Sequence, residues 1–261
     1  MFAALLAALL AFHAPGARAG QTCTEKELPP ADVRAGLTLA LDLAHELDGD
    51  GAQVAIVARV GQDLSRYGLR YSHLGIARRD PASGTWMMVE ELNRCGTAHS
   101  TLYADGFGNF FLDDMFAYEA KVVIPSAAVQ RQLDAALASG TAMRLHEPRY
   151  NEIAYPWSTR YQNCNQWVLE TLAAALDPQA VASRATAQAW LRAAGYRPST
   201  LHVAPFEQLG AQLFATNIAF DDHPQDRVLA GDIDVVTAES VIDFVTRIDA
   251  GATVRVLSVS R

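Results

Sequence analysis

The sequence predicts an α+β fold in which an antiparallel sheet packs against helices. Short runs rich in β-branched and aromatic residues, bounded by turn residues, predict strands over 53–60, 71–77, 86–92 and 118–124. Apolar residues at helical spacing predict helices over 32–47, 126–138 and 183–194, and from Cys164 to just before Pro178. The turn at Asp80-Pro81-Ala82-Ser83-Gly84 joins two of these strands as a hairpin, so the sheet is expected to be antiparallel.

The length and composition favour one large domain. Half of the 261 residues are apolar and 19% are charged, which is enough to build a full core. We expect a single domain over 20–261, with a core over about 31–195 and an extra C-terminal α/β segment over 196–261. The 29 acidic and 21 basic residues give a net charge of −8, which argues against a nucleic-acid surface or an anionic membrane as partner.

The first residues are typical of a signal peptide. Phe2 to Phe12 is almost entirely Ala and Leu and is too short to span a bilayer. The small residues Ala17 and Ala19 match an Ala-x-Ala cleavage site, although the n-region contains no Lys or Arg. We therefore expect a signal peptide over 1–19, cleavage after Ala19, no stable membrane insertion after cleavage, and a periplasmic or secreted protein.

The first predicted helix begins at Asp32 and ends at the turn Asp48-Gly49-Asp50-Gly51. This turn resembles the start of a calcium loop. Ala52 and Gln53 follow it in place of further oxygen ligands, and no bidentate Glu completes an EF-hand. We interpret it as a turn leading into the strand over 53–60.

His73 lies in the second strand and is a candidate catalytic base. By alternation it shares a face with Gly75 and Ala77, so its ring is expected to stand in open space. Glu90 and Glu91 end the strand that follows, where a carboxylate could orient the ring. Adjacent residues point to opposite faces, so only one of them can face His73. We favour Glu90, with Glu91 as the second choice.

The segment from Cys95 to Asp114 is expected to be a loop. Its aromatic residues, among them Phe110 and Phe111, either cover a groove or form a satellite core. After the strand over 118–124, Ser126 caps a helix, and Leu145 to Pro148 is expected to form a short strand.

Cys164 is expected in the first turn of a helix for which Asn163 is the N-cap. Unpaired backbone N–H groups and the positive end of the helix dipole favour the thiolate there. The residues before it are unusually aromatic, which is typical of a wall around a reactive residue and also of an ordinary hydrophobic loop. Those aromatic residues are Tyr150, Tyr155, Trp157 and Tyr161.

The remaining chain adds predicted helices over 206–214 and 239–248 and strands over 232–236 and 254–259. Glycine-rich dinucleotide and phosphate loops, the Gly-x-Ser-x-Gly elbow, the His-Glu-x-x-His motif and zinc-finger spacings are all absent from the sequence. We expect no metal or organic cofactor.

Three cysteines remain after the predicted cleavage, so in an oxidising compartment one should stay unpaired. Cys23 lies near the new N-terminus, and Cys95 lies in the turn-like sequence Asn93-Arg94-Cys95-Gly96. We predict a Cys23–Cys95 disulfide, which leaves Cys164 as the free thiol. A catalytic role explains a free thiol in an exported protein.

Cys164, His73 and Glu90 are the parts of a cysteine hydrolase: a thiolate, a histidine that carries its proton, and a group that orients the histidine. Ser72-His73-Leu74-Gly75-Ile76, the acid at Glu90 and the late Asn163-Cys164 resemble the circularly permuted NlpC/P60 papain-like hydrolases. Three longer phrases resemble the DUF2145 family of uncharacterised bacterial exported proteins: residues 91–97, 109–114 and 161–167.

The resemblance to the permuted hydrolases implies a papain-like core and roles for three residues. It matches Cys164 to the nucleophile, His73 to the base and later acid, and Glu90 to the orienting residue. It also implies a peptide, amide or acyl substrate, cleaved by an amidase, peptidase or acyl-transfer reaction. The DUF2145 resemblance implies no activity.

Two other hypotheses remain. A non-catalytic periplasmic binding or assembly protein could keep the fold and hold a ligand in an aromatic groove around Phe110, Tyr155 and Trp157. A metal site could instead combine His73, Cys164 and a glutamate.

Overall fold

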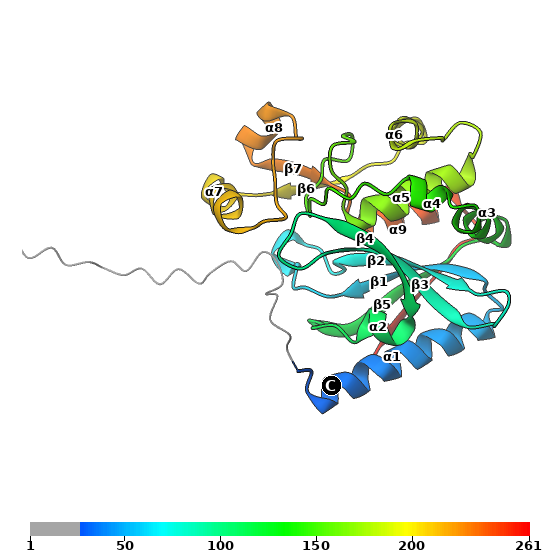
Figure 1. Ribbon diagram of the computed structural model, residues 1–261. Helices are drawn as coiled ribbons and strands as arrows, with labels where there is room; N and C mark the ends of the chain where they lie inside the picture. Colours follow the sequence, from blue (N-terminus) through cyan, green and yellow to red (C-terminus); the bar gives the residue numbers. More distant parts are fainter. Residues whose placement is uncertain (1–26) are drawn as a thin grey trace, which may run out of the picture.

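The computed structural model describes residues 27–261, apart from the side chains of residues 212–214. It has a mixed α+β fold built on a six-stranded antiparallel sheet with helices on both faces (Figure 1). The predicted α+β class and the antiparallel sheet are therefore confirmed. The predicted signal peptide and Cys23 lie outside the described residues.

The main sheet has the strand order β4-β3-β2-β1-β5-β8, and every neighbouring pair is antiparallel. The central strand β1 is buried at every residue because helices cover both faces of the sheet. The strands are β1 (Val54–Val60), β2 (His73–Arg79), β3 (Trp86–Asn93), β4 (Ser100–Gly106), β5 (Ala117–Ile124) and β8 (Thr253–Ser258).

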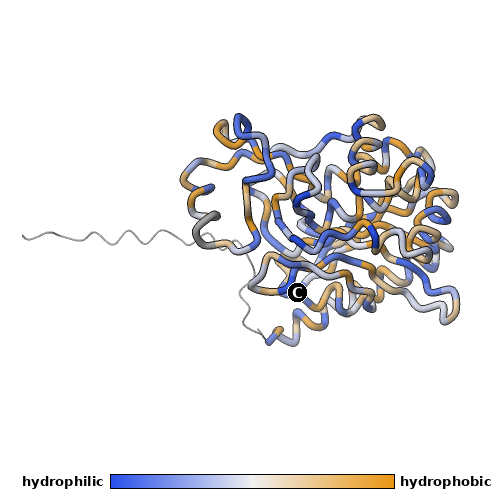
Figure 2. The backbone as a smooth tube through the Cα atoms, turned by 45° about the horizontal axis from the view of Figure 1, so that its top comes forward, coloured by the Kyte–Doolittle hydropathy of each residue, from blue (hydrophilic) through white to orange (hydrophobic). Residues whose placement is uncertain are grey.

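One face of the sheet is covered by α1 (Pro30–Gly49) and the short α2 (Phe107–Phe111). The other face carries α3 (Ala127–Ala138), α5 (Cys164–Leu176) and α9 (Ala238–Ile248), as Figure 1 shows. Figure 2 shows hydrophobic and hydrophilic residues alternating along much of the backbone, as expected for elements that present one side to a core. Two apolar layers result, one on each side of the sheet.

The expected loop over Cys95–Asp114 is wrong, because this segment contains β4 and α2. β4 pairs with β3 over Met87–Asn93, and the register runs from Met87 opposite Gly106 to Asn93 opposite Ser100. Phe110 and Phe111 are buried between the sheet and α1, so the aromatic residues belong to the main core and do not cover a groove.

The strand predicted over Leu145–Pro148 is wrong. The chain instead forms α4 (Thr141–Arg144) and then an irregular stretch. Side chains hold this stretch in place of a strand partner: Ser100 Oγ is 2.9 Å from His146 Nε2, and Glu147 N donates to Gln162 Oε1 at 2.8 Å.

The C-terminal segment over 196–261 is built into the main body. β8 forms the edge of the main sheet beside β5, and α9 buries Val241 and Phe244 in the core above it. A small second sheet pairs β6 with β7. The further elements are η1 (Ser65–Tyr67), α6 (Arg184–Ala193), β6 (Ser199–His202), α7 (Pro205–Phe214), α8 (Gln225–Ala230) and β7 (Asp232–Val235).

Within residues 27–261, none of the helices combines the length and the apolar character that a bilayer crossing requires.

The close packing of α1 on α2 gives a first prediction. A Cβ at Gly36 would lie 2.7 Å from the backbone oxygen of Phe111, whereas a Cβ at Gly49 in the same helix meets nothing within 4 Å. Gly36→Ala should therefore lower the free energy of unfolding by about 1–3 kcal/mol. Gly49→Ala should leave it unchanged or raise it slightly. Urea unfolding of both variants measures this, and equal stabilities would contradict the packing of α1 on α2.

Candidate active site

Cys164 is the first residue of α5, and its side chain is a buried free thiol. Asn163 adopts an extended conformation before it, and its side-chain oxygen accepts a hydrogen bond from Gln166 N at 2.8 Å. This is the N-cap that the sequence predicts. The Cys164 Sγ donates to Asn165 Oδ1 at 3.8 Å.

The first turn of α5 contains backbone N–H groups that have no partner within the helix. The N–H of Gln166 donates to the Asn163 side chain and that of Trp167 to the Asn163 carbonyl, at 2.8 and 3.0 Å. Within the described part of the chain, the N–H groups of Cys164 and Asn165 have no hydrogen-bond acceptor. These two donors point out of the helix end and are available to an anion.

His73 and Glu90 form a buried pair on neighbouring strands. His73 Nε2 lies 2.6 Å from Glu90 Oε2. In the β2–β3 register Ile76 lies opposite Val89, so continuing it by one residue places Glu90 opposite Gly75. His73 and Glu90 are then diagonal neighbours on one face, within reach of each other across the two strands. Glu91 points to the other face.

Cys164 lies close enough to His73 to act on the titration of its imidazole. Burial lowers the pKa of His73, but the charge and hydrogen bond of Cys164 and the hydrogen bond of Glu90 outweigh it and raise the pKa to about 9. The imidazolium form of His73 is therefore stabilised by its two neighbours, Cys164 and Glu90. The three residues that the sequence singles out come together in space.

The expectation that His73 stands in open space is wrong. The room left by Gly75 is filled, because a Cβ there would lie 2.6 Å from Met88 Sδ and 3.2 Å from Phe110 Cε2. The His73 ring lies 5.8 Å from the Phe110 ring, and Arg59 sits over the same phenyl ring at 5.0 Å. The glycine allows an aromatic wall to pack behind the histidine, which restricts the ring to one position.

Tyr150 is a site residue whose role the sequence does not reveal. Its hydroxyl is close enough to Cys164 for the sulfur to act on its titration, and its backbone is held by Ala98 O at 2.8 Å and by a bridge to Gln162. Burial and the nearby negative charges of Cys164, Glu152 and Glu91 raise the pKa of Tyr150 well above its usual value, so it remains a hydrogen-bond donor. Its place among the aromatic residues before Cys164 was the only signal.

Most of the chain matches one protein-family model. The model described as "Uncharacterized protein conserved in bacteria (DUF2145)" matches residues 46–245, which is more than half of the sequence and includes His73, Glu90, Tyr150 and Cys164. The chain belongs to the DUF2145 family. No curated protein and no solved structure matches it.

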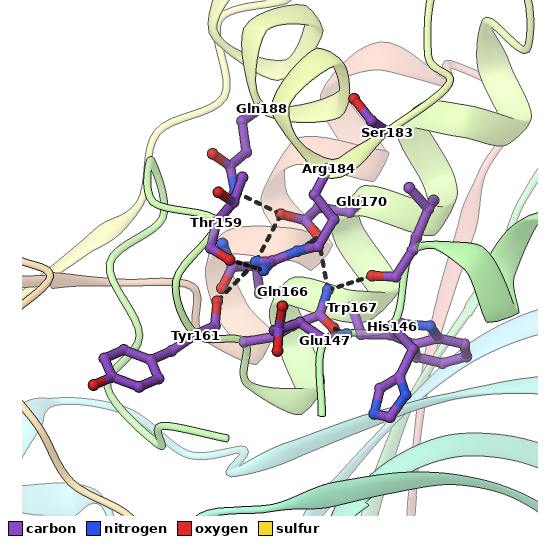
Figure 3. A network of polar contacts seen from close by, with 12 residues as sticks. His146, Glu147, Thr159, Tyr161, Gln166, Trp167, Glu170, Ser183, Arg184 and Gln188 are labelled. Carbon is purple, nitrogen blue, oxygen red and sulfur yellow. Dashed lines mark hydrogen bonds and ion pairs between the residues drawn. The ribbon is translucent and has the colours of Figure 1, made fainter. Parts of the chain in front are cut away.

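In this DUF2145 protein a buried ion pair holds the segment that leads to Cys164 (Figure 3). Arg184 on α6 donates to both carboxylate oxygens of Glu170 on α5, at 2.7 and 3.3 Å. The same guanidinium donates to the carbonyls of Thr159 and Tyr161, at 3.0 and 2.8 Å. Gln162 Nε2 donates to Glu170 Oε2 at 2.7 Å. The backbone immediately before Cys164 is thus tied to the helix that follows it.

Glu91 occupies the opposite face of β3 from Glu90 and is fully buried. Within residues 27–261 neither of its oxygens has a hydrogen-bond partner, and its Oε1 lies 3.9 Å from His146 Nε2. Burial raises the pKa of Glu91 to about 8, while Ser100, whose hydroxyl contacts His146, and Arg184 moderate the shift. Glu91 is therefore a neutral buried acid at pH 7, and Glu90 is the residue that contacts His73.

The described residues of this DUF2145 protein contain no group of three or more His, Cys, Asp or Glu side chains placed to hold a metal ion. The Cys23–Cys95 disulfide stays a prediction, because Cys23 lies outside the described residues.

Glu91 gives a prediction about the pH dependence of stability. Because its folded pKa of about 8 is above the usual 4.5, the folded state binds the proton more tightly than the unfolded state. Stability from this group is complete below pH 4.5 and is lost as the pH rises to about 8. Glu91→Gln should remove this loss, on the order of 3 kcal/mol between pH 5 and 8.

Urea unfolding at several pH values measures the difference. Glu147→Gln is the control, because Glu147 is paired with Arg149 near the surface at 2.9 Å. A Glu91→Gln variant whose stability follows the same pH curve as the wild-type protein would show that Glu91 is ionised in the folded state.

Proposed function

We propose that this protein is an exported cysteine hydrolase of the amidase, peptidase or acyl-transfer type, with Cys164 as nucleophile, His73 as general base and acid, and Glu90 as orienting residue. The observation that carries the proposal is that one buried imidazole contacts both the free thiol and a carboxylate. A nucleophile, a base within hydrogen-bond reach and a group that orients the base are the minimum for this chemistry.

In the proposed reaction the Cys164 thiolate attacks the substrate carbonyl and forms a carbon–sulfur bond. The tetrahedral intermediate collapses, the bond to the leaving group breaks, and the His73 imidazolium gives its proton to that group. Water then attacks the acyl-enzyme while His73 takes a proton from it, and the thiolate leaves as the acid product forms. In an acyl transfer a second nucleophile replaces the water.

The negative oxygen of the intermediate needs donors that are already in place. The backbone N–H groups of Cys164 and Asn165 are unoccupied at the start of α5, and the Tyr150 hydroxyl lies against the sulfur. We assign these three groups to the oxyanion site. The raised pKa of Tyr150 keeps its proton in place throughout the reaction.

The arrangement also supports the proposal of a papain-like core of the permuted NlpC/P60 type. The cysteine begins a helix packed on the sheet, the histidine begins a strand, and the orienting acid lies on the next strand. Histidine and acid precede the cysteine in the chain, and the geometry of a catalytic triad does not depend on chain order.

Export to the periplasm or the extracellular space remains part of the proposal. It rests on the N-terminal sequence, with its apolar run and Ala17-Arg18-Ala19 cleavage motif.

A second candidate function is supported by the burial of the nucleophile. Only 5% of Cys164 is exposed, which suits a protein that keeps the fold but holds a ligand without cleaving it. In that case Cys164 packs as a small apolar side chain and does not react.

Alkylation of Cys164 by iodoacetamide separates the two candidates. In the hydrolase, wild-type Cys164 should label at pH 7 at least about tenfold faster than an unperturbed thiol, because His73 stabilises the thiolate. His73→Ala should remove this advantage and Glu90→Gln should reduce it.

Mass spectrometry of the folded, non-reduced protein identifies the labelled cysteine, with Cys164→Ser as the control. Labelling at the rate of an ordinary thiol, with no dependence on His73, would support the binding protein in place of the hydrolase.

A further inference from the structure

The backbone of Glu152 is held against Asn163, the residue that precedes the proposed nucleophile. Its carbonyl accepts a hydrogen bond from Asn163 Nδ2 at 3.1 Å, so it is tied to the residue that caps the Cys164 helix. Its N–H donates to Asn217 O at 2.9 Å. The negative charge of Glu152 is also close enough to raise the pKa of Tyr150, whose hydroxyl contacts Cys164.

Among residues 27–261, no Lys, Arg or His lies within ion-pair distance of the Glu152 carboxylate. Within the same residues its hydrogen bond comes from Asn217 Nδ2, at 3.4 Å to Oε2. Two other buried or half-buried glutamates have cationic partners: Glu170 pairs with Arg184, and Glu119 pairs with Arg70 at 2.8 Å. Burial raises the pKa of Glu152, and the Asn217 hydrogen bond only partly opposes this.

Glu152 differs from the other unbalanced acid near the site. Glu91 is sealed inside the core, whereas Glu152 keeps part of its surface in contact with solvent. A carboxylate that is partly desolvated but accessible gains most from a cation that arrives with a ligand. An ammonium group placed there would restore the charge balance that the protein itself does not supply.

We propose that Glu152 is a specificity residue that binds a cationic group of the substrate, an ammonium group close to the carbonyl that Cys164 attacks. This rests on the proposed function and names its substrate class: amides or peptides with a positively charged amine on the part of the molecule beside the scissile bond. Analogues in which that amine is neutral or replaced by an anion leave Glu152 unpaired and are rejected.

The test uses two thiol reagents that share one reactive group and differ in charge. These are the trimethylammonium-ethyl and the sulfonato-ethyl methanethiosulfonates, each of which forms a mixed disulfide with Cys164 and releases methanesulfinate. Rates are measured on the full-length, non-reduced protein at pH 8.5, a high pH chosen to favour the ionised carboxylate. The measured quantity is the ratio of the cationic rate to the anionic rate at Cys164.

The wild-type ratio should exceed that of Glu152→Gln on the order of tenfold, because the carboxylate attracts one reagent and repels the other. Glu152→Asp, which keeps the charge, should retain most of the preference. Glu46→Gln is the matched control, since it removes the same charge from α1 on the opposite face of the sheet. Its ratio should equal that of the wild-type protein.

Three results would overturn the proposal. Reaction of Cys164 with an unchanged ratio in Glu152→Gln would remove Glu152 from recognition and leave the hydrolase proposal intact. An equal fall of the ratio in Glu46→Gln would show only an effect of net charge. A Cys164 that reacts with both reagents no faster than an unperturbed thiol would overturn the proposed function together with the role of Glu152.

Discussion

The candidate site depends on one buried hydrogen bond, between His73 Nε2 and Glu90 Oε2 at 2.6 Å. The carboxylate fixes the orientation of the imidazole, and with Nε2 engaged the other ring nitrogen remains for Cys164. Because the pair lies inside the protein, each partner would be costly to bury alone. The interaction therefore both stabilises the pairing of β2 with β3 and prepares the histidine to share a proton with the sulfur.

Cys164 begins α5, which covers the face of the sheet opposite α1 and α2, and separate contacts hold the segment before it. The segment before Cys164 is irregular, and the ion pair of Arg184 with Glu170, together with Gln162, fixes its backbone. These contacts join α6, α5 and the approach to the cysteine in one network (Figure 3). This network positions the Cys164 sulfur, and Glu90 positions the His73 ring. The candidate site therefore depends on two separately stabilised parts of the core.

Local patterns predicted much of this structure and singled out the three residues of the candidate site. The N-cap at Asn163 and the helices and strands of the core followed from short-range spacing. The choice between Glu90 and Glu91 depended on strand register, which one sequence does not determine. Gly75 was misread because its small size accommodates Met88 and Phe110 from distant elements. Tyr150 and Glu152 acquire their roles only through contacts made across the fold.

The most direct test is an NMR titration of the His73 imidazole in the folded protein. The account predicts that His73 titrates near pH 9 and that Cys164→Ser moves its titration to lower pH, because the negative charge of the sulfur is lost. A His73 that titrates near its ordinary value of 6.5, unchanged by Cys164→Ser, would show that the two side chains do not interact.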